Sequence, residues 1–253
     1  MKHKRLAVLA GLILFISISA FIIYSNTYKE EINYVALGDS LAAGRNSYGA
    51  YDYGYADYVR DYLKQNDKLS SYANYAVSGY STENIINDIN YNRTIEVDGI
   101  EVGLKRALRE SDLVTISIGA NDLLKNINIS SVSSLLSDRN GTRKIVDETF
   151  EKIKDVLSLV RQYAKGDIIV IGYYNPIPSI TKYKKSIDDI VDYSNKQYQQ
   201  LCNTSEIYYA EISNVIESNS DYLPNPRDIH PNSRGYRAIG AEIIKIVDKE
   251  ILK

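Results

Sequence analysis

The chain has 253 residues, of which 44% are hydrophobic and 25% are charged, a composition that excludes a disordered or fibrous protein. Its 30 basic and 32 acidic residues give a formal net charge of -2, so no overall positive field favours a nucleic-acid partner. The single cysteine, Cys202, excludes an intramolecular disulfide, and we expect it to be a buried apolar side chain.

The first elements along the chain are a basic flank at 2–5 and an uncharged apolar run at 6–24. As a helix this run would be roughly 28 Å long, which matches the hydrocarbon core of a bilayer. Signal peptides usually have a shorter apolar segment, so we predict an uncleaved transmembrane anchor at 1–24, with a cleaved signal segment as the alternative. The positive flank predicts a cell-membrane protein whose folded part lies on the extracytoplasmic side, or a secreted protein if the segment is cleaved. Residues 25–31 are expected to be a tether.

Short β-branched or tyrosine-rich runs alternate with longer helical patterns in the rest of the chain, which is typical of a parallel sheet wrapped by helices. We predict five strands, at 32–37, 72–77, 113–118, 168–171 and 207–210. We predict helices at 55–65, 82–89, 102–110, 142–163, 187–202 and 233–251. The expected fold is a three-layer α/β/α sandwich with a central, mostly parallel five-stranded sheet, in one domain over 32–253.

Three residues with chemical potential come soon after predicted strands. Ser40 follows the first strand in Gly38-Asp39-Ser40, Gly79 follows the second strand, and Asn121 follows the third. Because parallel strands end at the same edge of an open sheet, we expect these residues to lie close together. Ser40 has a nucleophilic hydroxyl, Gly79 has a backbone N–H with no side chain in front of it, and Asn121 has an amide donor. Taken singly, each residue has a structural alternative, as a helix cap or a turn.

Only one imidazole is available to the folded domain. The chain has 2 histidines, and His3 belongs to the basic flank of the predicted anchor. His230 stands in Asp228-Ile229-His230-Pro231-Asn232, just before the last predicted helix. Serine hydrolases usually activate a hydroxyl nucleophile with an imidazole, and His230 could have this role. The alternative is that His230 is a surface loop residue without a catalytic role.

The segments around Ser40, Gly79, Asn121 and His230 resemble those of the SGNH/GDSL hydrolase family, which carry Ser, Gly, Asn and His in this chain order. The resemblance spans essentially the whole predicted domain and looks closest to a bacterial GDSL-type lipase/esterase subgroup, to which Tyr174-Asn175-Pro176 is also similar. It implies a flavodoxin-like SGNH hydrolase fold. It also implies a nucleophilic Ser40, a base His230, and an oxyanion hole made by the N–H groups of Ser40 and Gly79 and the side-chain amide of Asn121.

The acid of the catalytic triad departs from the family pattern. The family's usual acid stands three residues before the histidine, a place that Arg227 occupies here. An arginine cannot accept a hydrogen bond from imidazole. Either Asp228 reaches Nδ1 of His230 or a backbone carbonyl orients the ring. We assign Asp228 as the acid, and we expect Asp39 to hold the nucleophile loop rather than to join the proton transfer.

The resemblance implies a serine-dependent carboxylic ester hydrolase that acts through an acyl-enzyme on Ser40. Small esters, lipids including lysophospholipids, and acylated glycans are the expected substrates. An O-acetylesterase of cell-wall polysaccharide and a non-catalytic binding module on the same fold are the alternatives. We predict no cofactor, and no metal site, because one usable histidine and one cysteine are too few for a zinc site.

Tyrosines crowd the stretch after the predicted nucleophile. Tyr55, Tyr58 and Tyr62 are spaced along one face of a helix, which we expect to pack on the sheet. A second group, in the glycine-containing loop before that helix, is predicted to border an acyl or sugar site: Tyr48, Tyr51 and Tyr53. The alternative is that tyrosine simply serves as the general aromatic residue of this chain, which has 23 Tyr and 3 Phe.

Overall fold

The structure, a computed structural model, describes residues 31–126, 138–178 and 181–252. No helix within these ranges is both long and apolar enough to cross a membrane. The predicted anchor at 1–24 and residues 25–30 of the predicted tether lie outside the described residues.

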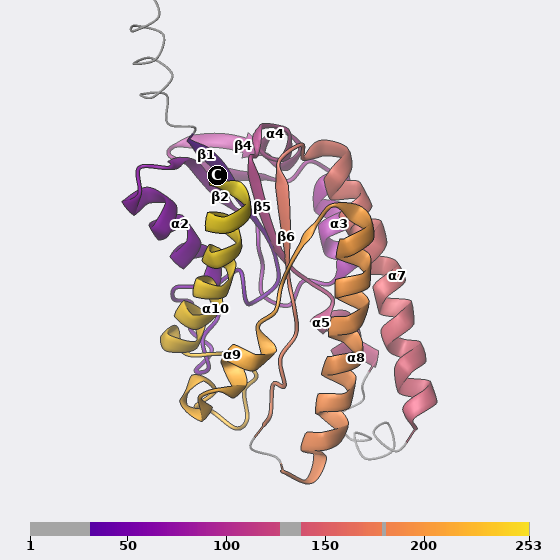
Figure 1. The fold of residues 1–253 in the computed structure, drawn as a ribbon. Helices are drawn as coiled ribbons and strands as arrows, with labels where there is room; N and C mark the ends of the chain where they lie inside the picture. Colours follow the sequence, from indigo (N-terminus) through magenta and orange to yellow (C-terminus); the bar gives the residue numbers. More distant parts are fainter. Residues whose placement is uncertain (1–30, 127–137, 179–180, 253) are drawn as a thin grey trace, which may run out of the picture. The chain divides into compact units, whose positions relative to one another are not determined.

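The centre of the domain is a five-stranded sheet in which every neighbouring pair of strands is parallel. Its strands are β1 (Ile32–Gly38), β2 (Leu69–Asn74), β5 (Leu113–Ser117), β6 (Asp167–Ile171) and β7 (Tyr208–Ala210). They lie in the order β2-β1-β5-β6-β7 (Figure 1). The chain leaves β1 toward β2 on one side and returns to β5 on the other, so the strand order reverses between β1 and β5. Ligands of open α/β sheets bind beyond the carboxyl ends of the strands at this point.

Helices cover both faces of this sheet (Figure 1). One face carries α2 (Tyr55–Gln65), α9 (Ser213–Glu217) and α10 (Ser233–Ile246), and the other carries α3 (Thr82–Asn90), α4 (Leu104–Glu110), α7 (Arg139–Tyr163) and α8 (Thr181–Ser205). The remaining helical segments are α5 (Ala120–Asn126), the short turn η2 (Ser220–Tyr222) and a wider helical turn, η3 (Val247–Ile251), that continues from α10. The predicted α/β fold with a parallel five-stranded sheet and flanking helices is confirmed.

Alternation along β1 explains why this strand is buried on both sides. Tyr34 and Ala36 belong to the core beneath α2 and α10, whereas Val35 and Leu37 belong to the core beneath α7 and α8. Successive side chains of a strand point to opposite faces, so a nearly continuous apolar run suits a sheet that is covered on both faces. The prediction that Cys202 is buried is confirmed, in the core on the α8 side.

The second strand begins three residues earlier than predicted and ends at Asn74. The side-chain oxygen of Asn74 accepts a hydrogen bond from the backbone N–H of Ala76 at 3.0 Å, which turns the chain out of the regular strand. A two-stranded hairpin that was not predicted from the sequence follows α3, with strands β3 (Thr94–Val97) and β4 (Ile100–Gly103). Its turn residues, Asp98 and Gly99, both have positive φ, at 50° and 79°, as a type I′ turn requires. The predicted helix at 102–110 therefore starts only at Leu104.

The other strands differ from their predicted bounds by one residue at one end, and several helices differ more. α7 begins at Arg139 rather than at residue 142, because the carboxylate of Asp138 accepts the backbone N–H of Gly141 at 3.0 Å and caps the helix. α8 is longer than predicted at both ends, and α5, α9 and η2 were missed. The helix at 55–65 has the predicted bounds.

The tyrosine face of α2 packs only in part as expected. Tyr55 is fully buried in the core on the α10 side. Tyr58 instead donates its hydroxyl to the backbone carbonyl of Ser233 at 3.0 Å, and Tyr62 donates to the carboxylate of Asp248. Two of the three tyrosines therefore tie α2 to the C-terminal helical segments rather than to the sheet.

Candidate active site

The turn that presents Ser40 depends on a glycine at the end of β1. Gly38 has φ of +131°, and a Cβ at this position would lie 2.2 Å from the carbonyl oxygen of Ser117 on the neighbouring strand. Asp39 then accepts hydrogen bonds from the backbone N–H of Leu41 at 3.1 Å and from Ser117 Oγ at 2.9 Å. Burial raises the pKa of Asp39 to about 6. Asp39 thus holds the loop and has no contact with the imidazole in the described structure.

Ser40, His230 and Asp228 form a continuous chain of side-chain contacts. The Nε2 atom of His230 lies 2.8 Å from Ser40 Oγ, and its Nδ1 atom lies 2.5 Å from Asp228 Oδ1. The same carboxylate oxygen accepts the backbone N–H of His230 at 2.8 Å. Asp228, and not a backbone carbonyl, therefore faces Nδ1, whereas Arg227 turns its backbone N–H to Asn225 Oδ1 at 3.1 Å.

The surroundings of the imidazole favour its neutral form. Burial and, to a lesser extent, the positive charge of Arg45 together lower the pKa of His230 more than the Asp228 carboxylate raises it. Burial acts to raise the pKa of Asp228, but the hydrogen bonds from His230 and the electrostatic interactions with His230 and Arg45 together outweigh it and hold this pKa below its usual range. The arrangement combines a neutral proton acceptor with an ionised carboxylate behind it.

The side chain of Asn121 lies near Gly79, because it binds the backbone of the next residue, Tyr80. The Asn121 Nδ2 group donates one hydrogen to the backbone carbonyl of Tyr80 at 2.8 Å, which leaves its second hydrogen for another acceptor. Gly79 is exposed, has φ of +88°, and a Cβ there would meet no atom within 4 Å. Within the described residues, the backbone N–H groups of Ser40 and Gly79 have no hydrogen-bond acceptor. Donors are therefore available beside the carboxyl ends of β1, β2 and β5.

A buried carboxylate fixes the start of α5. Asp122 accepts the backbone N–H of Thr82 at 2.9 Å and the Thr82 hydroxyl at 2.7 Å. These bonds tie α5 to the first residue of α3, and so they fix the backbone that carries Asn121.

Two further tyrosines hold the loops of Ser40 and His230. The hydroxyl of Tyr236, on α10, donates to the backbone carbonyl of Arg45 and lies 3.5 Å from that of Ser40. The hydroxyl of Tyr174 donates to the backbone carbonyl of Ile229 at 2.6 Å. Neither tyrosine was predicted to belong to the site, although Tyr174 opens the family-like segment Tyr174-Asn175-Pro176.

The loop after the nucleophile turn exposes the tyrosines that were predicted to border a substrate site. Tyr48 is 78% exposed, Tyr51 is 65% exposed and Tyr53 is 42% exposed. The loop joins the nucleophile turn through a hydrogen bond from the Arg45 N–H to the Ser40 carbonyl at 3.0 Å. The ring of Tyr53 packs edge-on against Tyr58 of α2, at 5.5 Å between ring centres.

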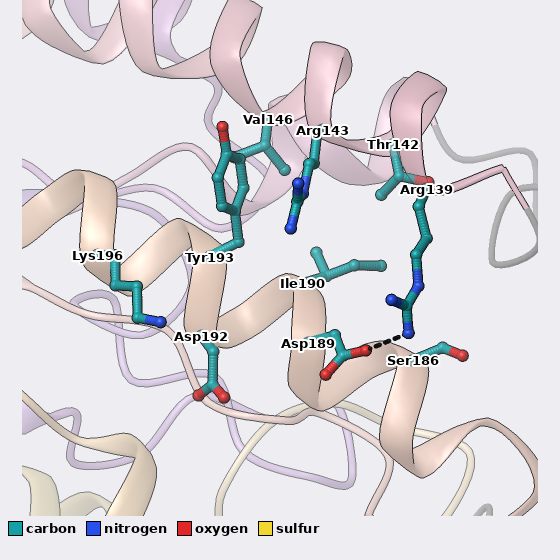
Figure 2. Close-up of a pocket in the computed structure, with 10 residues that line it drawn as sticks. All are labelled: Arg139, Thr142, Arg143, Val146, Ser186, Asp189, Ile190, Asp192, Tyr193 and Lys196. Carbon is teal, nitrogen blue, oxygen red and sulfur yellow. Dashed lines mark hydrogen bonds and ion pairs between the residues drawn. The ribbon is translucent and has the colours of Figure 1, made fainter.

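A separate hollow of about 230 Å³ lies between α7 and α8. Its lining residues come from these two helices alone, and Figure 2 shows the ion pair of Arg139 with Asp189, at 2.9 Å, at one end. The Arg143 guanidinium lies 5.0 Å from the ring centre of Tyr193 in the same hollow. None of the predicted site residues lines it. Among the described residues, no cluster of three or more His, Cys, Asp or Glu side chains is arranged to hold a metal ion.

Comparison with known proteins agrees with this architecture. The chain is 26% identical to the spore germination lipase LipC of Bacillus licheniformis over 219 residues, which cover 84% of this chain and 94% of LipC. It is similar in fold to the lipase Lip_vut3 from a goat rumen metagenome, with a TM-score of 0.70 and 22% identity over 87% of this chain and 99% of that one. It is also similar to the acetylxylan esterase Axe2 of Geobacillus stearothermophilus, with a TM-score of 0.59 and 15% identity over 88% and 97% of the two chains.

A model of the GDSL-like lipase/acylhydrolase family matches residues 36–238, which is well over half of the chain. The matched range begins within β1 and ends within α10, so it includes Ser40, Gly79, Asn121 and His230. The chain therefore belongs to the GDSL-like lipase/acylhydrolase family and is a hydrolase that acts on ester bonds.

Proposed function

We propose that this protein hydrolyses carboxylic esters through an acyl-enzyme on Ser40, with His230 as the base and Asp228 as the carboxylate that orients it. The observation that carries the proposal is the contact of His230 Nε2 with Ser40 Oγ at 2.8 Å while Nδ1 faces Asp228 at 2.5 Å. Distances of this size are within the reach of direct proton transfer.

In the proposed reaction, Ser40 Oγ attacks the ester carbonyl carbon as its proton passes to His230 Nε2. The carbonyl oxygen becomes an oxyanion, which the N–H groups of Ser40 and Gly79 and the free amide hydrogen of Asn121 stabilise. The bond to the alcohol oxygen then breaks, and the alcohol leaves with the proton from His230. A water molecule gives a proton to His230 and attacks the acyl carbon, which releases the carboxylic acid and restores the Ser40 hydroxyl.

The lowered pKa of His230 predicts the pH dependence of this reaction. The protonated ring cannot accept the Ser40 proton, so we expect kcat/KM to be lost as the pH falls through a pKa below about 6.5, the ordinary value for histidine. Replacing Arg45 with Gln removes a positive charge that disfavours imidazolium, so the acid limb should move to higher pH. The pH profile of kcat/KM measures this shift.

Arg106→Gln is the matched control, because it removes the same charge from an exposed arginine that is 62% accessible and paired with Glu110. The pH profile of Arg106→Gln should match that of the unmodified protein. An equal shift in both variants, or a shift to lower pH in Arg45→Gln, would contradict the proposed role of Arg45.

We propose lipid or other acyl esters as the substrates, and the outer side of the cytoplasmic membrane as the place of reaction. The lipases LipC and Lip_vut3 support the substrate class by their likeness to this chain. The exposed rings of Tyr48 and Tyr51, on the loop joined to the nucleophile turn, offer apolar surface to an acyl chain. The basic flank and apolar run at 2–24 support the location.

Assays of the full chain with p-nitrophenyl esters from acetyl to palmitoyl, beside lysophospholipid and acetylated xylan, test the substrate class. We expect the triple replacement of Tyr48, Tyr51 and Tyr53 by Ala to lower kcat/KM for long-chain esters about tenfold and to change acetyl ester hydrolysis little. Tyr91→Ala, which removes a tyrosine that is 84% exposed elsewhere, is the control. An unchanged chain-length preference would contradict the proposed contact of these tyrosines with the substrate.

The proposed location has its own test, in which intact and lysed cells are given a membrane-impermeant ester. Hydrolysis by lysed but not by intact cells would contradict a reaction on the outer side of the membrane.

A further inference from the structure

The segment Tyr174-Asn175-Pro176 follows β6 and has no part in the proton transfers proposed above. Tyr174 is only 8% exposed, and its hydroxyl donates to the Ile229 carbonyl at 2.6 Å across 55 residues of sequence. Burial, together with the negative charges of Asp39 and Asp228, raises the pKa of Tyr174 far above its ordinary range. The hydroxyl therefore stays protonated and remains a donor at any working pH.

The Ile229 carbonyl belongs to the same peptide group as the His230 backbone N–H. On one side, this peptide group accepts the hydrogen bond from Tyr174, and on the other it donates to Asp228 Oδ1 at 2.8 Å. That same oxygen also faces His230 Nδ1 at 2.5 Å. The peptide plane is thus held at both ends, and hydrogen bonds in such a series polarise and strengthen one another.

The two hydrogen bonds on this peptide group matter because the acid, Asp228, stands only two residues before His230. A carboxylate at that spacing reaches Nδ1 by folding back over its own loop, where it bonds both the backbone and the ring of His230. Rotation of the peptide between Ile229 and His230 would move the N–H away from Asp228 and would release the carboxylate from the ring.

Hydrogen bonds attach the residues on either side of Tyr174 to α8. Asn195 accepts the backbone N–H of Tyr173 at 2.8 Å and donates to the Tyr173 carbonyl at 2.9 Å. Asn175 is fully buried and donates its side-chain amide to Asp188 at 2.6 Å. The phenol thus projects from a segment that two asparagine side chains attach to a long helix.

We propose that Tyr174 is a positioning residue of the esterase reaction, whose hydroxyl orients Asp228 against His230 by holding the peptide group between them. The inference rests on the proposed function, because it assigns Tyr174 an effect on a proton transfer through His230. Loss of a group that orients a metal-bound histidine typically costs about 10–100-fold in activity, and we expect an effect of similar size for a group that orients a catalytic histidine.

Tyr174→Phe removes the hydroxyl and keeps the ring. We expect kcat to fall about tenfold and KM to stay within about twofold, because Tyr174 is almost fully buried and its hydroxyl is bonded to the Ile229 carbonyl. Tyr209→Phe is the matched control, since the Tyr209 hydroxyl is buried without a hydrogen-bond partner among the described residues. Tyr209→Phe should leave kcat unchanged.

Combination with Asp228→Asn separates positioning from a general structural effect. If Tyr174 acts through Asp228, Tyr174→Phe should lower kcat by less than about twofold when Asp228→Asn is already present. A tenfold loss in both backgrounds, or no loss in either, would overturn the proposal. The acid limb of the pH profile should also move to lower pH in Tyr174→Phe, because a weaker contact with Asp228 stabilises imidazolium less.

Asp188→Ala provides a second variant if Tyr174→Phe does not fold. It releases Asn175 from α8 and should lower kcat in the same way, again only while Asp228 is present. A loss that persists in the Asp228→Asn background would overturn the proposal here too. Full activity of Ser40→Ala would instead overturn the proposed function itself, so the two failures give different results.

Discussion

Ser40→Ala is expected to lower kcat by roughly 10⁴-fold or more and to abolish covalent labelling by a fluorophosphonate probe. The variant lacks the oxygen that lies 2.8 Å from His230 Nε2, so no acyl-enzyme can form. The fold should survive, because removal of one hydroxyl leaves the Asp39 bonds that hold the turn. Steady-state hydrolysis of a p-nitrophenyl ester and mass spectrometry of the labelled protein measure the two effects.

Ser47→Ala is the matched control for this substitution. Ser47 lies seven residues further along the same loop, is fully buried, and its Oγ has no hydrogen-bond partner among the described residues. Its hydroxyl can therefore be removed without loss of a contact to the site. Labelling of Ser40→Ala at the rate of the unmodified protein would show that another residue is the nucleophile.

Asn121→Ala has the second largest expected effect, a fall of about 10²–10³ in kcat with little change in KM. Its amide hydrogen is proposed to meet charge that develops only in the transition state, so its loss should not weaken substrate binding in the ground state. The variant also loses the bond to the Tyr80 carbonyl, which positions the residue next to Gly79. Kinetics with a p-nitrophenyl ester, beside a thermal melt, separate the catalytic effect from a loss of folding.

Asn87→Ala is the control for Asn121, because it deletes an exposed amide from α3. Activity and melting temperature of this variant should match those of the unmodified protein. A parallel rise of KM and fall of kcat in Asn121→Ala would indicate a role in ground-state binding rather than in stabilising the oxyanion.

Much of the fold was predictable because the local patterns agree with the tertiary structure. β1 reads as a nearly unbroken apolar run because helices cover both of its faces, and α2 begins where Gly54 and Asp57 form a cap. The hairpin of β3 and β4 was also within reach, since Asp98-Gly99 is a strong turn signal. The end of β2 was harder, because Asn74 interrupts a stretch of otherwise strand-forming residues.

The sequence by itself determined which groups are available for chemistry: one imidazole for the folded domain, and a serine, a glycine and an asparagine at the ends of strands. Each of the last three follows a strand that can be recognised from its local sequence pattern. Because parallel strands end at the same edge of a sheet, these residues are expected to lie close together.

Only the tertiary structure decided how His230 is held. Whether Asp228 or a backbone carbonyl faces Nδ1 depends on how the loop before α10 folds back, which no spacing rule specifies. The support from Tyr174 spans 55 residues and arises because the segment after β6 lies against the loop that carries His230. Contacts between segments that are distant in sequence depend on how the whole domain packs, so local sequence patterns do not predict them.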